Sequence, residues 1–274
     1  MENKEFLMTD KDYRYISKRV YDSCGIVLSE QKKDMVYARI SRRVRMFGLN
    51  TFSQYIEYLE ENEETEFVEF INSITTNLTS FFRERHHFEF LLDKAVPEIK
   101  ARHAMDKRVR IWSAGCSLGM EPYSIAMTLY KAFPSSWDFK VLATDLDTNV
   151  LATAQEGVYE TNQIDGVSKD QLKQFFFKDA SSNRFKIKPL LTPYIHFKQL
   201  NLLTPWPMKG PFDVIFCRNV IIYFDNPTKL KLFERYASML APGGYLILGH
   251  SETMGRDVKN FKPLGQNIYQ KVGA

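Results

Sequence analysis

The stretch that decides the fold is VRIWSAGCSLGMEPYSIA, residues 109–126. It opens with an apolar run typical of a buried strand, passes through a turn that contains Gly115 and Gly119, and ends in a helical pattern. Pro122 falls in the first turn of that helix, where proline is favoured. A strand that leads through a glycine turn into a helix is typical of a doubly wound sheet, which binds nucleotides at the carboxyl end of its first strand. Small residues in such a turn let a ligand approach the backbone closely. The turn matches neither GxGxxG nor the GK[ST] of a P-loop, so the dinucleotide and nucleoside-triphosphate interpretations weaken.

The residues after this stretch continue the alternation of strands and helices. Further strands are predicted at 139–144, 195–200, 212–217 and 245–248, with helices at about 121–132, from about 148, and at about 227–240. This alternation predicts an α/β fold with a mostly parallel sheet and right-handed crossovers, closed by a hairpin within 261–272. Residues 157–197 interrupt the pattern, and RFKIK (184–188) alternates basic with apolar residues. We therefore expect an inserted β subdomain there.

The amino-terminal part reads as a small all-helical domain. Thr9 or Asp10, Ser29, Thr51 and Thr65 are each placed to begin an amphipathic helix. The predicted organisation is thus a helical domain at 1–82, a linker helix at 83–106 and a sheet domain at 107–274.

Composition excludes several classes of protein. The chain has 274 residues, of which 44% are hydrophobic and 26% charged, as in ordinary globular proteins. Its longest apolar run, about five residues, is far short of the ~18 that a spanning helix needs. Three separated cysteines form no CxxC pair, and the five histidines form no HExxH. The sequence therefore predicts a cytoplasmic protein without a structural metal.

Charge is concentrated in one predicted helix. The net charge is only +4, yet residues 31–45 contain six basic residues and one acidic residue. At ~100° per residue, Lys32, Arg39 and Arg43 lie together beside the apolar stripe, and Arg42 and Arg45 extend this face. Residues 57–69 hold seven glutamates. The basic face is either a solvated surface or a binding surface for an acidic partner.

Polar side chains follow several predicted strands. Asp145 ends the second strand, where an acidic group accepts hydrogen bonds from ribose hydroxyls, while Asp147 is the better candidate to cap the next helix. Arg218 and Asn219 follow the fourth strand. Asn201 and Leu202 follow the third, where they can cover an adenine ring. Because parallel strands end at one edge of a sheet, these groups predict a single site.

A segment between the two halves adds further polar groups. In NLTSFFRE (77–84), Asn77, Thr79 and Arg83 alternate with apolar residues. Such a segment is either a plain connection or one that directs its polar side chains into a site.

Four motifs together give a resemblance to a known family. NLTSFFRE (77–84), IWSAGCSLGMEPYSIA (111–126), ATDLD (143–147) and FCRNVIIYFD (216–225) resemble the CheR family, the chemotaxis receptor methyltransferases. The resemblance covers nearly the whole chain, including KKDMVYARISRRVR (32–45) and GYLILGHSE (244–252). One departure is Met120, where the family usually carries a second glutamate before Glu121.

The resemblance implies a Rossmann-like fold, a cofactor and a reaction. Members bind S-adenosylmethionine, release S-adenosylhomocysteine and methylate glutamate side chains of methyl-accepting chemotaxis receptors, without a metal. The family's cofactor contacts fall here on Asn77, Thr79, Arg83, Glu121, Asp145, Asn201, Leu202, Arg218 and Asn219. Arg83 and Tyr223 are the residues expected to face the reacting groups.

The resemblance also implies partners. The cytoplasmic helical domain of the receptors is the expected partner, and Lys32, Arg39, Arg42 and Arg43 form the expected receptor-binding surface. In some members the β subdomain docks on a short peptide at the receptor's carboxyl terminus, which makes such a peptide a candidate partner. A cytoplasmic monomer, held at receptor arrays by protein contacts alone, is expected.

Two other functions stay open on the residues alone. A nucleic-acid methyltransferase would use the basic helix, although no DPPY-like sequence is present to hold a flipped base; its binding would fall steeply with salt. A non-catalytic signalling adaptor would require a broken cofactor site, yet the polar residues at the strand ends are all present. A nicotinamide oxidoreductase is disfavoured because GxGxxG is missing.

Overall fold

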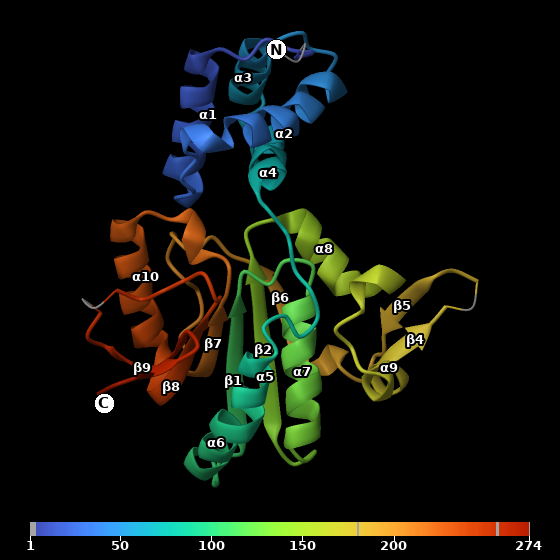
Figure 1. Ribbon diagram of the computed structural model, residues 1–274, viewed down its shortest axis with the longest axis vertical. Helices are drawn as coiled ribbons and strands as arrows, with labels where there is room; N and C mark the ends of the chain where they lie inside the picture. The colour runs from blue at the N-terminus through green and yellow to red at the C-terminus, as the bar shows by residue number, and fades with distance from the viewer. Residues whose placement is uncertain (1–3, 180, 256–257, 274) are drawn as a thin grey trace. The chain divides into compact units, whose positions relative to one another are not determined.

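The computed structural model describes residues 4–179, 181–255 and 258–273 and divides the chain into two compact units (Figure 1). The first unit holds the chain up to residue 76 together with residues 223–228, and the second holds the remainder. Within the described residues, no helix is both long and apolar enough to cross a membrane. The domain boundaries placed above at residues 82 and 106 stay predictions.

Amphipathic helices build the first unit. Its α-helices are α1 (Asp10–Cys24), α2 (Lys33–Met46), α3 (Phe52–Glu61) and α4 (Glu63–Ile74). Val36, Ile40 and Val44 of α2 are fully buried, as their helical spacing predicts. Residues 223–228 belong to this unit: the Val27 amide donates to the Tyr223 carbonyl oxygen at 2.8 Å.

The helix starts of the first unit test the capping expectations. Thr9 and Thr51 cap α1 and α3 through their hydroxyl oxygens, which confirms both assignments. Ser29 instead precedes a short 3-10 helix, η1 (Glu30–Lys32), and makes no side-chain cap. The expected start at Thr65 was also wrong. The chain turns directly from α3 into α4 at Asn62, whose carbonyl oxygen already accepts the amide of Thr65, so the helix begins ahead of that residue.

A seven-stranded sheet organises the second unit. Its order is β6-β2-β1-β7-β8-β10-β9, and β6, β2, β1, β7 and β8 pair in parallel while β10 is antiparallel to both neighbours. The strands are β1 (Arg108–Ala114), β2 (Asp138–Asp145), β6 (Ile195–Gln199), β7 (Phe212–Cys217), β8 (Leu240–Leu248), β9 (Phe261–Gly265) and β10 (Ile268–Lys271). The predicted doubly wound sheet and its closing hairpin are thereby confirmed.

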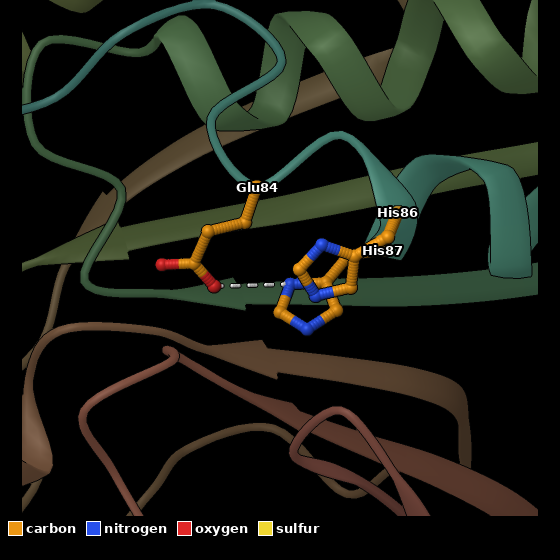
Figure 2. A group of neighbouring side chains, drawn as sticks. All are labelled: Glu84, His86 and His87. Atoms are coloured by element: carbon orange, nitrogen blue, oxygen red, sulfur yellow. Dashed lines mark ion pairs between the residues drawn. The ribbon is translucent and has the colours of Figure 1, made fainter.

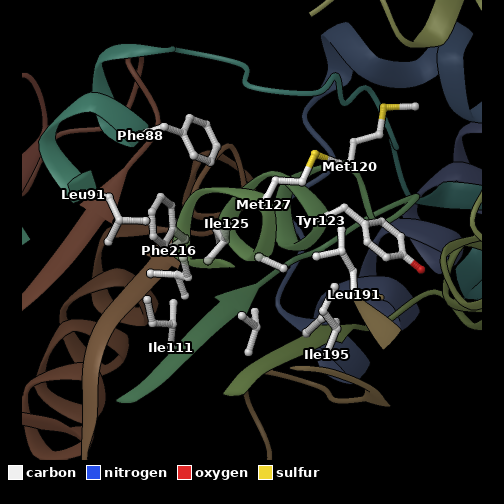
Figure 3. Packing of buried hydrophobic residues seen from close by; sticks show 14 of the residues in the cluster. Phe88, Leu91, Ile111, Met120, Tyr123, Ile125, Met127, Leu191, Ile195 and Phe216 are labelled. Atoms are coloured by element: carbon white, nitrogen blue, oxygen red, sulfur yellow. The ribbon is translucent and has the colours of Figure 1, made fainter. Parts of the chain in front are cut away.

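Helices cover both faces of this sheet. The helices are α5 (His86–Phe90), continued through a π-helical turn η2 (Leu91–Ala95) into α6 (Val96–Arg102), then α7 (Met120–Ala132), α8 (Thr148–Glu156) and α10 (Asn226–Met239). On one face, Ile111 and Phe216 belong to the core that also includes Phe88 and Ile125 (Figure 3). On the other face, the Trp112 ring lies 5.5 Å from the Tyr236 ring of α10. Successive β1 residues thus serve opposite layers, as strand geometry requires.

The strand order places a switch point between β1 and β7. The chain goes from β1 to β2 and β6 on one side, and β7 and β8 continue on the other. The connections that leave β1 and β7 therefore diverge at the carboxyl ends of these two strands. Open α/β sheets bind their ligands at this position.

A second, small sheet interrupts the second unit. β3 (Val158–Glu160), β4 (Phe176–Lys178) and β5 (Arg184–Ile187) form an antiparallel sheet in the order β3-β5-β4, accompanied by α9 (Lys169–Phe175). RFKIK thus supplies its central strand.

Candidate cofactor site

The glycine turn after β1 is shaped by packing within the chain. Gly115 has φ +97°, and a Cβ built there would lie 2.3 Å from the Val220 side chain. Gly119, with φ +86°, leads into α7, and its Cβ would lie 2.7 Å from the Ala154 side chain. Both positions exclude other residues by backbone conformation and by space. At Gly115 the space of the missing Cβ is filled by Val220, and close approach of a ligand to this turn stays a prediction.

Asp145, at the end of β2, binds the same turn. One of its carboxylate oxygens accepts the Ser117 amide at 2.7 Å, and the other accepts the Asp147 amide at 3.0 Å. Burial raises the pKa of Asp145 to about 6. A carboxylate has about four lone-pair positions, so this group retains acceptor capacity for ligand hydroxyls.

Asn77 reaches this turn from the segment before α5. Its side-chain amide donates to Asp147 Oδ2 at 2.8 Å, and its carbonyl oxygen accepts the Ser117 hydroxyl at 3.3 Å. Asp147 also caps α8 through the amides of Asn149 and Val150, as the sequence predicted. Thr79, two residues further on, is half-buried and makes no hydrogen bond to any residue in the described ranges. Asn77 and Asp145 therefore meet the glycine turn from two elements.

A buried ion pair links the ends of β1 and β7. Arg218 donates to Glu121 Oε2 at 3.1 Å, and the Ser113 hydroxyl donates to Glu121 Oε1 at 2.7 Å. Arg218 also donates to the Arg83 carbonyl oxygen at 2.5 Å. Burial raises the pKa of Glu121, and the Arg218 guanidinium opposes that shift. The preceding residue, Met120, is 2% exposed and packs in the core (Figure 3).

Arg83 sits in a strained segment. Phe82 and Glu84, on either side of it, have φ +52° and +56°, a region that costs non-glycine residues of order 1 kcal/mol or more. One guanidinium nitrogen of Arg83 donates to the Leu78 carbonyl oxygen at 2.8 Å. Its other N–H groups have no partner among the residues described. Such strain is concentrated at functional sites in proteins.

Glu252 also binds backbone at these strand ends, and no sequence pattern singled it out. Its carboxylate accepts the amides of Asn219, Val220 and Gly249 at 2.7, 2.8 and 2.7 Å, and that of Ile222 at 3.3 Å. Asn219 itself has φ +60°. Burial raises the pKa of Glu252, although these amides favour its ionised form. The only available signal was its place in GYLILGHSE, because backbone amides leave no trace in a sequence.

Asn201 and Leu202 follow β6. Asn201 Oδ1 accepts the Leu203 amide at 2.9 Å, and the Leu202 carbonyl oxygen accepts the Trp206 indole at 3.2 Å and Arg235 at 2.5 Å. The Leu202 side chain is 8% exposed. These bonds fix a tight turn at the edge where Asp145 ends β2, the strand paired with β6.

Tyr223 belongs to the first unit. It ends the short 3-10 helix η5 (Ile221–Tyr223), and the Lys32 ammonium lies 5.2 Å from the centre of its ring. The other residues expected at the cofactor site all belong to the second unit.

The basic face of α2 is only partly free. Arg43 forms an ion pair with buried Glu66, and Arg39 donates to the Thr75 carbonyl oxygen and the Thr76 hydroxyl, both at 2.8 Å. Lys32 donates to the Val27 carbonyl oxygen at 3.2 Å. Arg42 is exposed and makes no hydrogen bond or ion pair to any residue the structure describes.

Two models of known protein domains match this chain. The model of the all-alpha domain of CheR methyltransferases matches residues 11–75, and that of their SAM-binding domain matches residues 77–270. The chain belongs to the CheR methyltransferase family. The seven-stranded sheet is therefore the family's S-adenosylmethionine-binding domain, and the resemblance and the Rossmann-like methyltransferase fold inferred from the motifs are confirmed.

Relatives match over almost their full length. A probable chemotaxis protein methyltransferase of Rhizobium etli is 42% identical over 92% of this chain and 96% of its own. The chemotaxis protein methyltransferase of Escherichia coli is 41% identical over 96% of this chain and 91% of its own. A solved S-adenosylmethionine dependent methyltransferase from Mesorhizobium loti is 18% identical, with a TM-score of 0.31 over 57% of this chain and 54% of that one. That last likeness is too distant to add to the argument.

The residues at the strand ends suit the cofactor of the CheR family. Asp145 offers a buried carboxylate whose spare acceptor capacity suits ribose hydroxyls, and Thr79 offers a hydroxyl that has no partner among the described residues. Glu121 and Arg218 pair with each other, and Glu252 accepts backbone amides. These three side chains therefore hold the turns in place.

Proposed function

We propose that this protein transfers the methyl group of S-adenosylmethionine to glutamate side chains of chemotaxis receptors and so forms glutamyl methyl esters. The observation that carries the proposal is the match to named chemotaxis protein methyltransferases at about 40% identity along nearly the whole chain. The cofactor-binding domain of the family and the strand-end residues described above support it. The proposed setting is the cytoplasm, at receptor arrays.

The proposed cofactor contacts divide by position. Asp145 accepts hydrogen bonds from the ribose hydroxyls, and Asn201 and Leu202 cover the adenine. The proposed contacts from the other strand ends and from the connecting segment are Asn77, Thr79, Arg83, Glu121, Arg218 and Asn219. Glu121 and Arg218 pair with each other, so their main contribution is to shape the wall of the site.

The reaction requires no general base from this chain. A glutamate has a pKa near ~4.3 and is already ionised at neutral pH. The bound cofactor supplies an electrophilic methyl group on a sulfonium. Arg83 has N–H groups free to hold one oxygen of the substrate carboxylate, and we assign Tyr223 to the same reacting groups. Their contribution is orientation and the exchange of water for fixed dipoles.

Receptor recognition is assigned to the basic face of α2 and to the β subdomain. Arg42 has no hydrogen bond or ion pair to any described residue, while Lys32, Arg39 and Arg43 have contacts within the unit. The small sheet β3-β5-β4 is the proposed dock for a receptor's carboxyl-terminal peptide.

The deciding experiment supplies methyl-labelled S-adenosylmethionine and receptor-containing bacterial membranes, followed by treatment with base. Carboxyl methyl esters release labelled methanol in alkali, whereas N-methyl and C-methyl products do not. We expect base-labile label on receptor protein. Base-stable label on nucleic acid would replace this proposal with a nucleic-acid methyltransferase. Bound cofactor without transfer to any of several receptors would support the adaptor instead.

A further inference from the structure

Both ring nitrogens of His87 face oxygen acceptors. The side chain is fully buried, and Nε2 lies 2.9 Å from the carbonyl oxygen of Gln266. Nδ1 lies 3.4 Å from Glu84 Oε2 and has no hydrogen-bond partner within the part of the chain that the structure describes. A carbonyl oxygen can only accept, so Nε2 carries a proton. Nδ1 faces a carboxylate oxygen, so either a second proton or a cation belongs between them.

A buried lone pair opposite a carboxylate is unfavourable unless a positive group lies between them. Unsatisfied buried acceptors cost free energy, and here two acceptors are adjacent. A cation shared by Nδ1 and the Glu84 oxygen would convert this unfavourable contact into coordination. A second proton on Nδ1 would serve this pair alone, whereas a metal ion would also bind further ligand atoms nearby.

His86 completes a set of three ligands. Its ring centre lies 4.1 Å from that of His87, and one ligand atom each from Glu84, His86 and His87 lie within 4.8 Å of one another (Figure 2). His86 and Glu84 are half-buried, so the group can be reached from solvent. All three residues come from the start of α5 and the turn before it. The cluster consequently needs no movement of distant parts of the chain.

The surroundings set the local charge and orient the carboxylate. Arg218 lies 3.4 Å from Glu84 Oε2, but it is also paired with Glu121 at 3.1 Å. Two carboxylates against one guanidinium leave one net negative charge for a cation. His250 Nδ1 lies 3.2 Å from the other Glu84 oxygen, and the His250 amide donates to Oε2 at 3.1 Å.

We propose that Glu84, His86 and His87 bind a divalent transition-metal ion of the zinc class. Two imidazoles and one carboxylate are a ligand set that zinc accepts, with a fourth position left for water or another group. Neighbouring histidines match none of the spacings by which zinc sites are recognised in sequences, so the sequence offered no reason to expect a metal here. The proposal stands independently of the methyl-transfer reaction.

Such an ion would fix the segment that carries Arg83. Glu84 directly follows Arg83 and has a left-handed backbone, φ +56°, while the histidines begin α5. Coordination would hold this strained turn against the helix. The proposed role is therefore structural support of the site rather than Lewis-acid catalysis.

The test adds Co²⁺ to the whole chain after treatment with a chelator. Binding is followed by the visible d–d absorption of the bound Co²⁺, which is then displaced with Zn²⁺. We expect one equivalent of Co²⁺ to bind. His86→Ala changes a half-buried side chain and should weaken binding at least tenfold. His196→Ala, an exposed histidine on β6, is the matched control and should leave the titration unchanged. His87→Asn, with folding checked by circular dichroism, should lose the absorption.

Two results would overturn the proposal. The first is a titration in which His86→Ala binds Co²⁺ as tightly as the unaltered protein. The second is the absence of cobalt absorption when the unaltered protein is titrated, and ¹⁵N chemical shifts of a doubly protonated His87 would then give the reason. In that case a proton, not a metal ion, would pair the Nδ1 atom with Glu84.

Discussion

Single side chains at the strand ends bind the backbone of the turns around them. Asp145 receives the amides of Ser117 and Asp147, and Glu252 receives those of residues 219, 220, 222 and 249. Each carboxylate thereby fixes a turn next to the switch point of the sheet. Replacing either carboxylate would also release the turn that it holds. Such a substitution should therefore change ligand binding.

The ionisation of Asp145 should control cofactor affinity. Its pKa is raised to about 6, and the ionised form is the one that we propose accepts ribose hydroxyls. Affinity for S-adenosylmethionine should be complete above pH 6 and fall about tenfold per pH unit below it, because one proton competes with binding. Isothermal titration calorimetry across this range measures the effect.

Asp145→Asn is the control for that titration. Loss of the charged acceptor should weaken binding at neutral pH by at least about tenfold, the effect of hydrogen bonds to a charged group. The affinity of this variant should not change through pH 6. A slope that persists in the variant would assign the titration to another group.

Arg83→Ala should weaken cofactor binding and slow methyl transfer together. Arg83 holds the Leu78 carbonyl oxygen and keeps N–H groups free for the substrate carboxylate, so both functions depend on one guanidinium. We expect each to fall by about tenfold or more. Equilibrium binding and initial rates of ester formation separate the two effects. Near-normal values of both would remove Arg83 from the site.

At the scale of elements, α2 shows that a charged face can also serve folding. Arg43 pairs with Glu66 of α4, whose carboxylate also accepts the Tyr55 hydroxyl at 2.6 Å. Arg39 binds the last carbonyl oxygens of α4. The basic and acidic stretches that look separate in the sequence therefore partly neutralise each other within one unit.

Arg43→Ala should destabilise the helical unit far more than Arg42→Ala. Removing one partner of a buried ion pair leaves Glu66 uncompensated, which costs about 3 kcal/mol. Arg42 has no partner among the described residues, so its loss should fall within ~0.5 kcal/mol. Urea unfolding followed by circular dichroism compares them. Equal stabilities would show that the Arg43 pair contributes nothing.

Arg42→Glu should lower methylation of receptor without changing cofactor affinity. The charge reversal affects the free cation of the proposed receptor surface and leaves the Arg43–Glu66 pair intact. A double change that includes Arg43 would mix recognition with stability. Receptor methylation is measured at subsaturating receptor, and Arg42→Lys is the control that keeps the charge. Unchanged methylation by Arg42→Glu would make this face a solvated surface.

At the scale of the whole molecule, the proposed site residues belong to two units. Those assigned to the cofactor lie in the sheet unit, whereas Tyr223 lies in the helical unit under the Lys32 ammonium. The chain leaves the sheet unit at Ile222 and returns at Lys229. Substitutions can therefore be made in one unit at a time, and their effects on activity compared.

Tyr223→Phe should slow methyl transfer while cofactor affinity and stability are unchanged. The ring that lies near Lys32 is retained, and only the hydroxyl is lost. Single-turnover rates and calorimetric binding test this. If the rate is unaffected, the tyrosine does not orient the reacting groups and its role is confined to the helical unit.

Local sequence patterns were enough to predict the α/β sheet, the helical unit and the order of strands along the chain. Strand and helix periodicities, glycine turns and caps such as Thr9 and Asp147 act over a few residues, so a local pattern suffices to predict them. The predicted positions of Asp145 and Arg218 at strand ends follow from the same patterns. The predicted helix starts at Ser29 and Thr65 were wrong. A 3-10 turn follows Ser29, so α2 begins later, and α4 begins before Thr65.

The contacts between distant side chains depend on how the elements pack in three dimensions. Nothing in the sequence pairs Arg43 with Glu66, gathers four amides around Glu252, fills the space at Gly115 with Val220, or turns both nitrogens of His87 toward acceptors. Each contact joins atoms whose distance depends on how separate elements pack. Local patterns fix the elements, but the partner of a buried polar group is chosen by the three-dimensional arrangement that satisfies all such groups together.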